Sequence, residues 1–167
     1  MVEKTAILKN LNALDRLHRK PTSAKNGLFY SKLALIELCG WIEVSMDDII
    51  SKCAKRNLKK RSNLKFSNEQ IVGKTFGFEY NKHFRSMLRN LIGLIQLEKL
   101  EKKVDSSKFH ALKSTLGTLK AARNNQAHTY IRGVTITLNA PSTTIRHFSI
   151  VYEGLKEFEQ QLKKMGQ

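Results

Sequence analysis

The sequence has little of three things: cysteine, long apolar runs and acidic side chains. Its two cysteines, Cys39 and Cys53, lie in one apolar helical stretch of the 167 residues. They show no CxxC spacing and no nearby histidine pair, which argues against a zinc site, and their separation along one helix excludes a disulfide between them. We interpret both as reduced core residues of a cytoplasmic protein.

No apolar run approaches the roughly 20 residues that a membrane-spanning helix needs. The polar start of the chain, MVEKTAILKN, lacks the apolar segment of a signal peptide. With 41% apolar and 26% charged residues, the composition is neither that of a disordered chain nor that of a membrane protein. We expect a single domain over residues 1–167 that stays in the cytoplasm and has no membrane partner.

The shortage of acidic residues gives the chain a strong positive charge. Lys and Arg number 30 against 14 for Asp and Glu, so the formal net charge is +16, and the isoelectric point is about 10.0. A field of this sign attracts polyanions, of which RNA and DNA are the most common in a cell. An anionic membrane surface or an acidic protein would be attracted equally, so charge alone assigns neither a fold nor an activity.

Apolar residues recur at helical spacing in five parts of the sequence. The predicted helices cover residues 4–20, residues 30–55 with Ser31 as a cap, residues 84–100, a segment that follows Asp105, and a last segment that begins at Pro141. Before the last helix, VTITLNAP is β-branched and predicts a short extended segment. Four or five amphipathic helices with one such segment predict an all-α fold, an antiparallel helical bundle.

The helical pattern loosens between residues 55 and 83, where we expect a basic insertion or loop. Six candidate RNA-binding residues fall at its start: Lys55, Arg56, Lys59, Lys60, Arg61 and Lys65. A run of like charges is either a solvated extension or a place where nucleic acid contacts the protein. The sequence leaves both interpretations open.

The stretch LKAARNNQAHTYIRG, residues 119–133, places Arg123, Asn124 and His128 near the end of a predicted helix. Asn124 and His128 share a helix face because they are four positions apart, whereas Arg123 and His128 lie roughly 140° apart around the axis. Asn124 can then orient the imidazole while the long arginine side chain reaches across the same groove. Alternatively, His128 is a polar residue near a helix end, and Arg123 is a surface cation that interacts with the helix dipole.

The run RNNQAH resembles the signature of HEPN domains, a superfamily of small all-helical ribonucleases. Most of the chain fits this resemblance, with the long helix LALIELCGWIEVSMDDII and the proline-started final helix APSTTIRHFSIVYEGLKEFEQQL. The whole is similar to the stand-alone HEPN families of bacterial defence and toxin systems. The resemblance implies a metal-independent endoribonuclease without a cofactor. It also implies a homodimer with a composite active site and, as further partners, an antitoxin or a larger defence complex.

Carried over by position, the resemblance assigns catalytic roles to three residues. His128 would act on the proton of the ribose 2′-hydroxyl, a task that suits a side chain whose pKa lies near neutrality. Arg123 would hold the phosphate and offset the charge that develops on its oxygens, and Asn124 would orient the site. The products would be a 2′,3′-cyclic phosphate or 3′-phosphate end and a 5′-hydroxyl end.

Two further residues are candidates for a supporting role. Tyr130 lies two positions after His128. This spacing resembles that of toxins in which a partner nucleotidyltransferase modifies the tyrosine, although Tyr130 could equally be a packed aromatic residue. Glu43, beside Trp41 and Ile42 in an apolar helix, either pairs with the site or lies on the polar side, because a buried carboxylate is costly unless it is paired.

Two other functions remain as alternatives. A HEPN-like dimer could hold RNA, or a partner that carries RNA, without cutting it. A metal-dependent nuclease is poorly supported, because no carboxylates or histidines have ligand spacing and we predict no metal site. The histidines outside the motif show no liganding pattern, and we interpret them as surface or cap residues: His18, His83, His110 and His147.

Overall fold

The computed structural model describes residues 2–127, 131 and 138–166, and its secondary structure is helical. Over these residues the elements are α1 (Thr5–Arg19), α2 (Ala24–Asn57), α3 (Arg61–Phe66), the π-helical turns η1 (Ser67–Val72) and η2 (Tyr80–Phe84), α4 (Arg85–Lys103), α5 (Ser106–Ala127) and α6 (Pro141–Lys164). No strand occurs in this part of the chain. The predicted all-α class is therefore confirmed, with six α-helices described instead of four or five.

The long helix α2 is the centre of the fold. It has 34 residues, and at 1.5 Å per residue it is roughly 51 Å long. It packs against α1, α4, α5, α6 and η1, and its fully buried side chains include Leu38, Ile42, Met46, Ile49 and Ile50. Because so many of its sides are covered, α2 fixes where the other helices lie.

The helix α2 begins earlier than its apolar pattern indicates. Its cap is Ser23, whose side-chain oxygen accepts a hydrogen bond from the backbone N–H of Asn26 at 3.1 Å. The prediction of Ser31 as a cap was wrong, because Ser31 is buried inside the helix at 3% exposure. Ser23 satisfies a backbone donor that would otherwise have no partner at the helix start.

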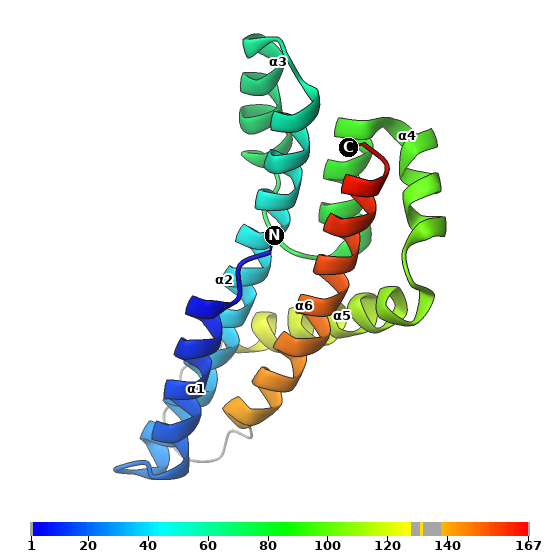
Figure 1. Cartoon of the computed structure of the whole chain (residues 1–167). Helices are drawn as coiled ribbons and strands as arrows, with labels where there is room; N and C mark the ends of the chain where they lie inside the picture. The colour runs from blue at the N-terminus through cyan, green and yellow to red at the C-terminus, as the bar shows by residue number, and fades with distance from the viewer. Residues whose placement is uncertain (1, 128–130, 132–137, 167) are drawn as a thin grey trace.

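Figure 1 shows α1 and α2 as an antiparallel hairpin, with α6 running in the same direction as α2. The helix α5 crosses behind α6 and reaches α2 with its C-terminal end, so it does not run along the other helices. Trp41 on α2 joins the start of the chain to this group, since its indole N–H donates to the Glu3 carbonyl at 2.8 Å. The C-terminal end of α5, which carries the start of the RNNQAH motif, thus lies against the middle of the central helix.

The segment between residues 55 and 83, predicted as a basic insertion or loop, is mostly helical and not a loop, and its being an insertion stays a prediction. The helix α2 continues to Asn57, and α3, η1 and η2 follow within this range. Ile71 and Phe78 are buried, and Tyr80 donates a hydrogen bond to Glu101 at 2.7 Å. These long-range contacts stabilise helical turns whose local apolar pattern is irregular.

Gly93 interrupts α4, for which the pattern predicts one continuous helix. Its φ of 79° lies in the left-handed region, which glycine adopts without steric cost. The apolar residues that follow the kink, Leu94 and Ile95, are exposed. The predicted extended segment lies largely outside the described residues, and Leu138–Ala140 have no regular secondary structure.

The helices α5 and α6 approach closely at Gly154. A Cβ atom added to Gly154 would lie 2.8 Å from the Cβ atom of Leu112, too close for two carbon atoms. Phe158, one turn further on, packs edge-on against Phe84 and Phe109. The missing side chain of Gly154 therefore allows the two helices to bring these rings together.

Replacing Gly154 with alanine should destabilise the protein by about 1–3 kcal/mol, because the new methyl group forces α5 and α6 apart. The matched control is Gly117→Ala. Gly117 also lies inside a helix, but a Cβ atom there meets nothing within 4 Å, so this change should stabilise the protein by up to about 1 kcal/mol. Urea unfolding of both variants measures the difference. A stabilised Gly154→Ala protein would contradict the close approach.

Candidate functional site

Arg123 lies on the last described turns of α5, where this helix meets the middle of α2. Its guanidinium Nη2 atom is 3.6 Å from a carboxylate oxygen of Glu43 on α2, and the two side chains are 42% and 32% exposed. The guanidinium also lies over the ring of Phe78, 6.0 Å from its centroid, at the outer limit of a cation–π contact. Arg123 is therefore held from two sides while part of it stays open to solvent.

The contact with Glu43 is an ion pair too long for a hydrogen bond, so it uses little of the hydrogen-bonding capacity of the arginine. A guanidinium has five N–H donors, and within the described part of the chain the 3.6 Å contact with Glu43 leaves most of them available. Of the two places that the sequence allowed for Glu43, the structure puts it beside Arg123. The arrangement gives an oriented, partly exposed cation that can take a second anion.

The segment from Gly77 to His83 lies next to Arg123, and sequence reasoning missed its contribution. Glu79 pairs with Lys120 of α5 at 2.8 Å, three residues before Arg123. The backbone N–H of Glu79 donates to Nδ1 of His83 at 3.0 Å, which places the proton of the neutral imidazole on Nε2. Burial, the largest cause, together with Lys82 and Lys120 lowers the pKa of His83, despite the opposing effects of Glu79 and Glu43.

The missing side chain of Gly77 makes room for the imidazole ring of His83 in this segment. The φ of +122° at Gly77 lies in the left-handed region, and a Cβ atom there would be 2.6 Å from the imidazole Cε1 atom. A side chain at position 77 would therefore displace the ring. A glycine between two phenylalanines, in TFGFEY, is the one sequence signal that indicates such a close approach, and the interpretation of His83 as a simple surface or cap residue was incomplete.

Burial and charge also change the titration of groups around Glu43. Burial raises the pKa of Asp47 to about 6, and the nearby carboxylates of Glu43 and Asp48 add to this effect. Burial raises the pKa of the Cys39 thiol to about 12, although Arg123 opposes it. Cys39 therefore stays protonated at neutral pH and is no nucleophile, in line with its interpretation as a core residue.

The structure places only part of the predicted catalytic set. Asn124 is exposed on α5. His128 and Tyr130 lie outside the described residues, so their geometry relative to Arg123 stays a prediction. The expected orientation of the imidazole by Asn124 also stays a prediction.

The six candidate RNA-binding residues are exposed and lie at one end of α2. Lys55 and Arg56 are in its last turn, Lys59 and Lys60 are in the connection, and the other two are on α3: Arg61 and Lys65. Arg56 lies thirteen positions after Glu43, which is roughly 20 Å along the helix. This basic end of α2 is therefore on the same helix as the arginine site but does not touch it.

The described residues include no group of three or more His, Cys, Asp and Glu side chains that could hold a metal ion. Among the helices of the described segments, none combines the length and low polarity that a membrane span requires. Comparisons of the chain with protein-family models, with curated proteins and with solved structures found no match.

Asp47→Asn should raise the free energy of unfolding at pH 7.5 by roughly 1–2 kcal/mol, less than the full pKa shift implies because Asp47 is partly exposed. The folded-state pKa of about 6 lies above the ordinary value of 3.8, so the folded protein binds this proton more tightly than the unfolded chain. The destabilising contribution of the Asp47 carboxylate should therefore disappear as the pH falls from 7.5 to 5, and the advantage of the variant over the wild-type protein should shrink. Urea unfolding at both pH values measures the difference in free energy of unfolding between Asp47→Asn and the wild-type protein. A difference of the same size at both pH values would contradict the raised pKa.

Proposed function

We propose that the chain is a metal-independent endoribonuclease of the HEPN type, which cleaves RNA by attack of a ribose 2′-hydroxyl on the adjacent phosphorus. The observation that carries this proposal is the position of Arg123. The residue begins the RNNQAH motif, is oriented by Glu43 and Phe78, and is 42% exposed in a chain of net charge +16. A toxin or phage-defence effector in the cytoplasm is the role that the resemblance adds.

Arg123 would bind the phosphate at which cleavage occurs. A planar guanidinium can donate two parallel hydrogen bonds to phosphate oxygens, and its charge offsets the negative charge that grows on them in the transition state. Glu43 holds one edge of the fork and thereby limits the directions in which the other donors point. Preorganisation of this kind lowers the entropic cost of positioning the phosphate.

His128 would take the proton of the 2′-hydroxyl as its oxygen bonds to phosphorus. The bond from phosphorus to the 5′-oxygen then breaks, and the leaving oxygen takes up a proton. This leaves a 2′,3′-cyclic phosphate on one fragment and a 5′-hydroxyl on the other. In the homodimer that the resemblance implies, two copies of Arg123 and His128 would share one cleft, so that one histidine accepts a proton while another donates one.

One observation favours the alternative of a binding module that does not cut. The guanidinium of Arg123 already has an anionic neighbour in Glu43, and an arginine in such a pair can serve structure alone. In that case the basic surface would hold RNA, or a partner that carries RNA, without turnover. The cleavage experiment below separates the two functions.

Purified wild-type protein should cut total RNA or tRNA in the presence of EDTA and leave 2′,3′-cyclic phosphate and 5′-hydroxyl ends. His128→Ala should reduce the cleavage rate at least about a hundredfold, because it removes the proton acceptor. Arg123→Lys should also be impaired, since an ammonium group keeps the charge but loses the planar fork. Mapping of the new RNA ends by sequencing measures both the rate and the chemistry.

The matched control for the arginine is Arg89→Lys, at an exposed position on α4. It should cut RNA at the wild-type rate. Cleavage retained by a nuclease-free His128→Ala preparation would reject the ribonuclease. RNA binding without turnover in the wild-type protein would instead support the binding module.

The basic end of α2 should contribute RNA affinity without contributing to the chemical step. Combined alanine substitution of Lys59, Lys60 and Arg61 should weaken RNA binding and lower the slope of log affinity against log salt concentration by roughly 2, because each lost phosphate contact with a single strand lowers it by about 0.7. The control removes equal charge from α4 at Lys99, Lys102 and Lys103. Equal losses in both proteins, measured by fluorescence anisotropy, would show that this end of α2 has no special role.

A further inference from the structure

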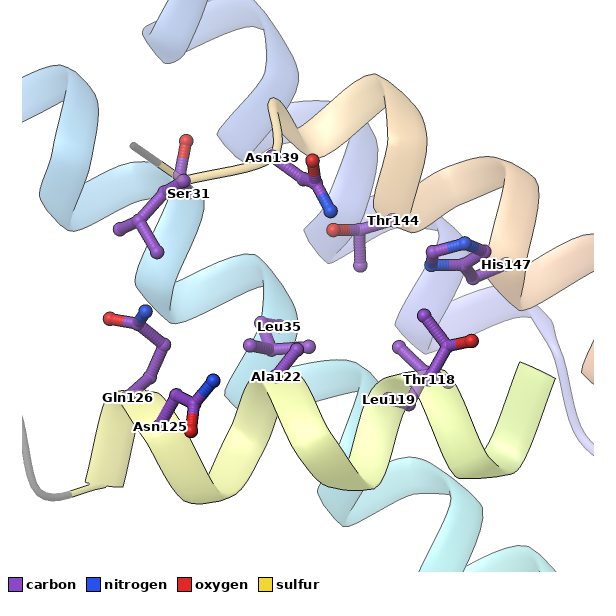
Figure 2. Close-up of a pocket in the computed structure, with 11 residues that line it drawn as sticks. Ser31, Leu35, Thr118, Leu119, Ala122, Asn125, Gln126, Asn139, Thr144 and His147 are labelled. Atoms are coloured by element: carbon purple, nitrogen blue, oxygen red, sulfur yellow. The ribbon is translucent and has the colours of Figure 1, made fainter. Parts of the chain in front are cut away.

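A cavity of about 180 Å³ lies where α5 meets α2 and the start of α6 (Figure 2). Leu35 and Leu119 contribute apolar surface to it, and Ala122 narrows it only slightly because its side chain is a single methyl group. A cavity of roughly 150 Å³ holds a benzene ring, whereas drug-sized ligands need roughly 300 Å³ or more. The space therefore fits one small ring system.

None of the described residues that line the cavity carries a charge at neutral pH, in a chain of net charge +16. The polar groups are amides, hydroxyls and one imidazole, that of His147. Burial and the nearby Arg146 lower the pKa of His147, so its ring stays neutral. A phosphate, carboxylate or ammonium group would lose its hydration here without a charged partner, whereas a neutral group with donors and acceptors on its edge would not.

Gln126 carries a hydrogen-bond acceptor that no described residue satisfies. The residue is 8% exposed, and its side-chain oxygen is fully buried without a donor. Gln126 on α5 and Asn139 in the segment before α6 both line the cavity, and Figure 2 shows them on different sides of it. A buried acceptor without a partner is destabilising, and Gln126 lines the cavity, so turning its amide toward a hydrogen-bond donor bound there would stabilise the side chain.

The cavity lies close to the arginine that would bind phosphate. Gln126 and Arg123 are three positions apart on α5, which makes them neighbours on the helix surface. On α2, Leu35 at the cavity and Glu43 at the arginine are two turns apart, roughly 12 Å along the axis. A short stretch of single-stranded RNA can therefore place a phosphate at Arg123 and a nearby base in the cavity.

We propose that this cavity binds one unpaired nucleobase of RNA, with the side-chain oxygen of Gln126 accepting a hydrogen bond from an exocyclic amino group. Adenine and cytosine carry such a group and uracil does not. Amide and hydroxyl side chains are the groups that read the edges of unpaired bases. The inference rests on the proposed function in that RNA is the molecule that supplies the base.

The test measures the binding of 2′-O-methyl octamers of A, C and U in EDTA by fluorescence anisotropy. These oligonucleotides cannot be cleaved through a 2′-hydroxyl, so they report binding alone. The wild-type protein should bind the A or the C octamer about tenfold more tightly than the U octamer. Ala122→Leu, which fills the cavity, should reduce this preference to less than about twofold while the affinity for the U octamer is retained.

The matched control is Ala121→Leu, which adds the same group at an exposed position one residue away on α5. It should keep both the affinity and the preference. Circular dichroism and thermal unfolding show whether each variant is folded. No preference in the wild-type protein, a preference for the U octamer, or a preference unchanged in folded Ala122→Leu would overturn the proposal.

Gln126→Met separates a role in recognition from a role in folding. The change removes a buried acceptor without a partner, so the unfolding temperature should stay the same or rise. The preference for the A or C octamer should nevertheless fall to the level of Ala122→Leu. If the preference survives in this variant, Gln126 does not read the base and the proposal is wrong.

The two proposals fail in different ways. Base preference without cleavage of natural RNA would reject the ribonuclease and leave the base-binding cavity standing. Cleavage by wild-type and Ala122→Leu proteins with equal rates and identical cut sites, together with equal octamer affinities, would reject the cavity and leave the ribonuclease standing.

Discussion

The apolar surface of α2 has to be covered on several sides, and the other helices are arranged to cover it. The helix α1 pairs with it as a hairpin, α6 runs beside it, and α5 meets its middle. The close approach at Gly154 brings α6 onto α5, which in turn packs against α2. The position of Arg123 therefore follows from the packing of the central helix.

This arrangement leaves polar groups at the margin of an apolar helix junction. Glu43 and Asp47 are partly buried on α2, and Glu43 lies close enough to His83 to affect its pKa. The charged groups therefore lie in a partly dehydrated setting, where electrostatic interactions are stronger than at an open surface. The uncharged cavity lies on the same helices a few turns away. The junction of these helices therefore contains both a charged site and an uncharged cavity large enough for a neutral ring.

Helical periodicity predicts the strongly amphipathic elements, and the structure has α1 and α6 within one or two residues of the expected positions. It fails where local signals are weak. The turns between residues 61 and 84 are stabilised by contacts with distant residues, such as Tyr80 with Glu101. For the site, the motif indicates Arg123 and a buried-carboxylate argument indicates Glu43. The pairing of Glu79 with Lys120 joins residues 41 positions apart, and no local pattern encodes it.

The contact between Arg123 and Glu43 means that a carboxylate lies beside the arginine before any ligand binds. A phosphate bound to the remaining donors of the guanidinium, as proposed, would place a second anion near Glu43 and Asp47. The negative charge of that phosphate would raise the pKa of Asp47 further, in addition to the effects of burial and of Glu43. The proposed binding of phosphate at Arg123 would therefore be coupled to proton uptake by Asp47, and the affinity for a phosphate of constant charge would decrease as the solution becomes more alkaline.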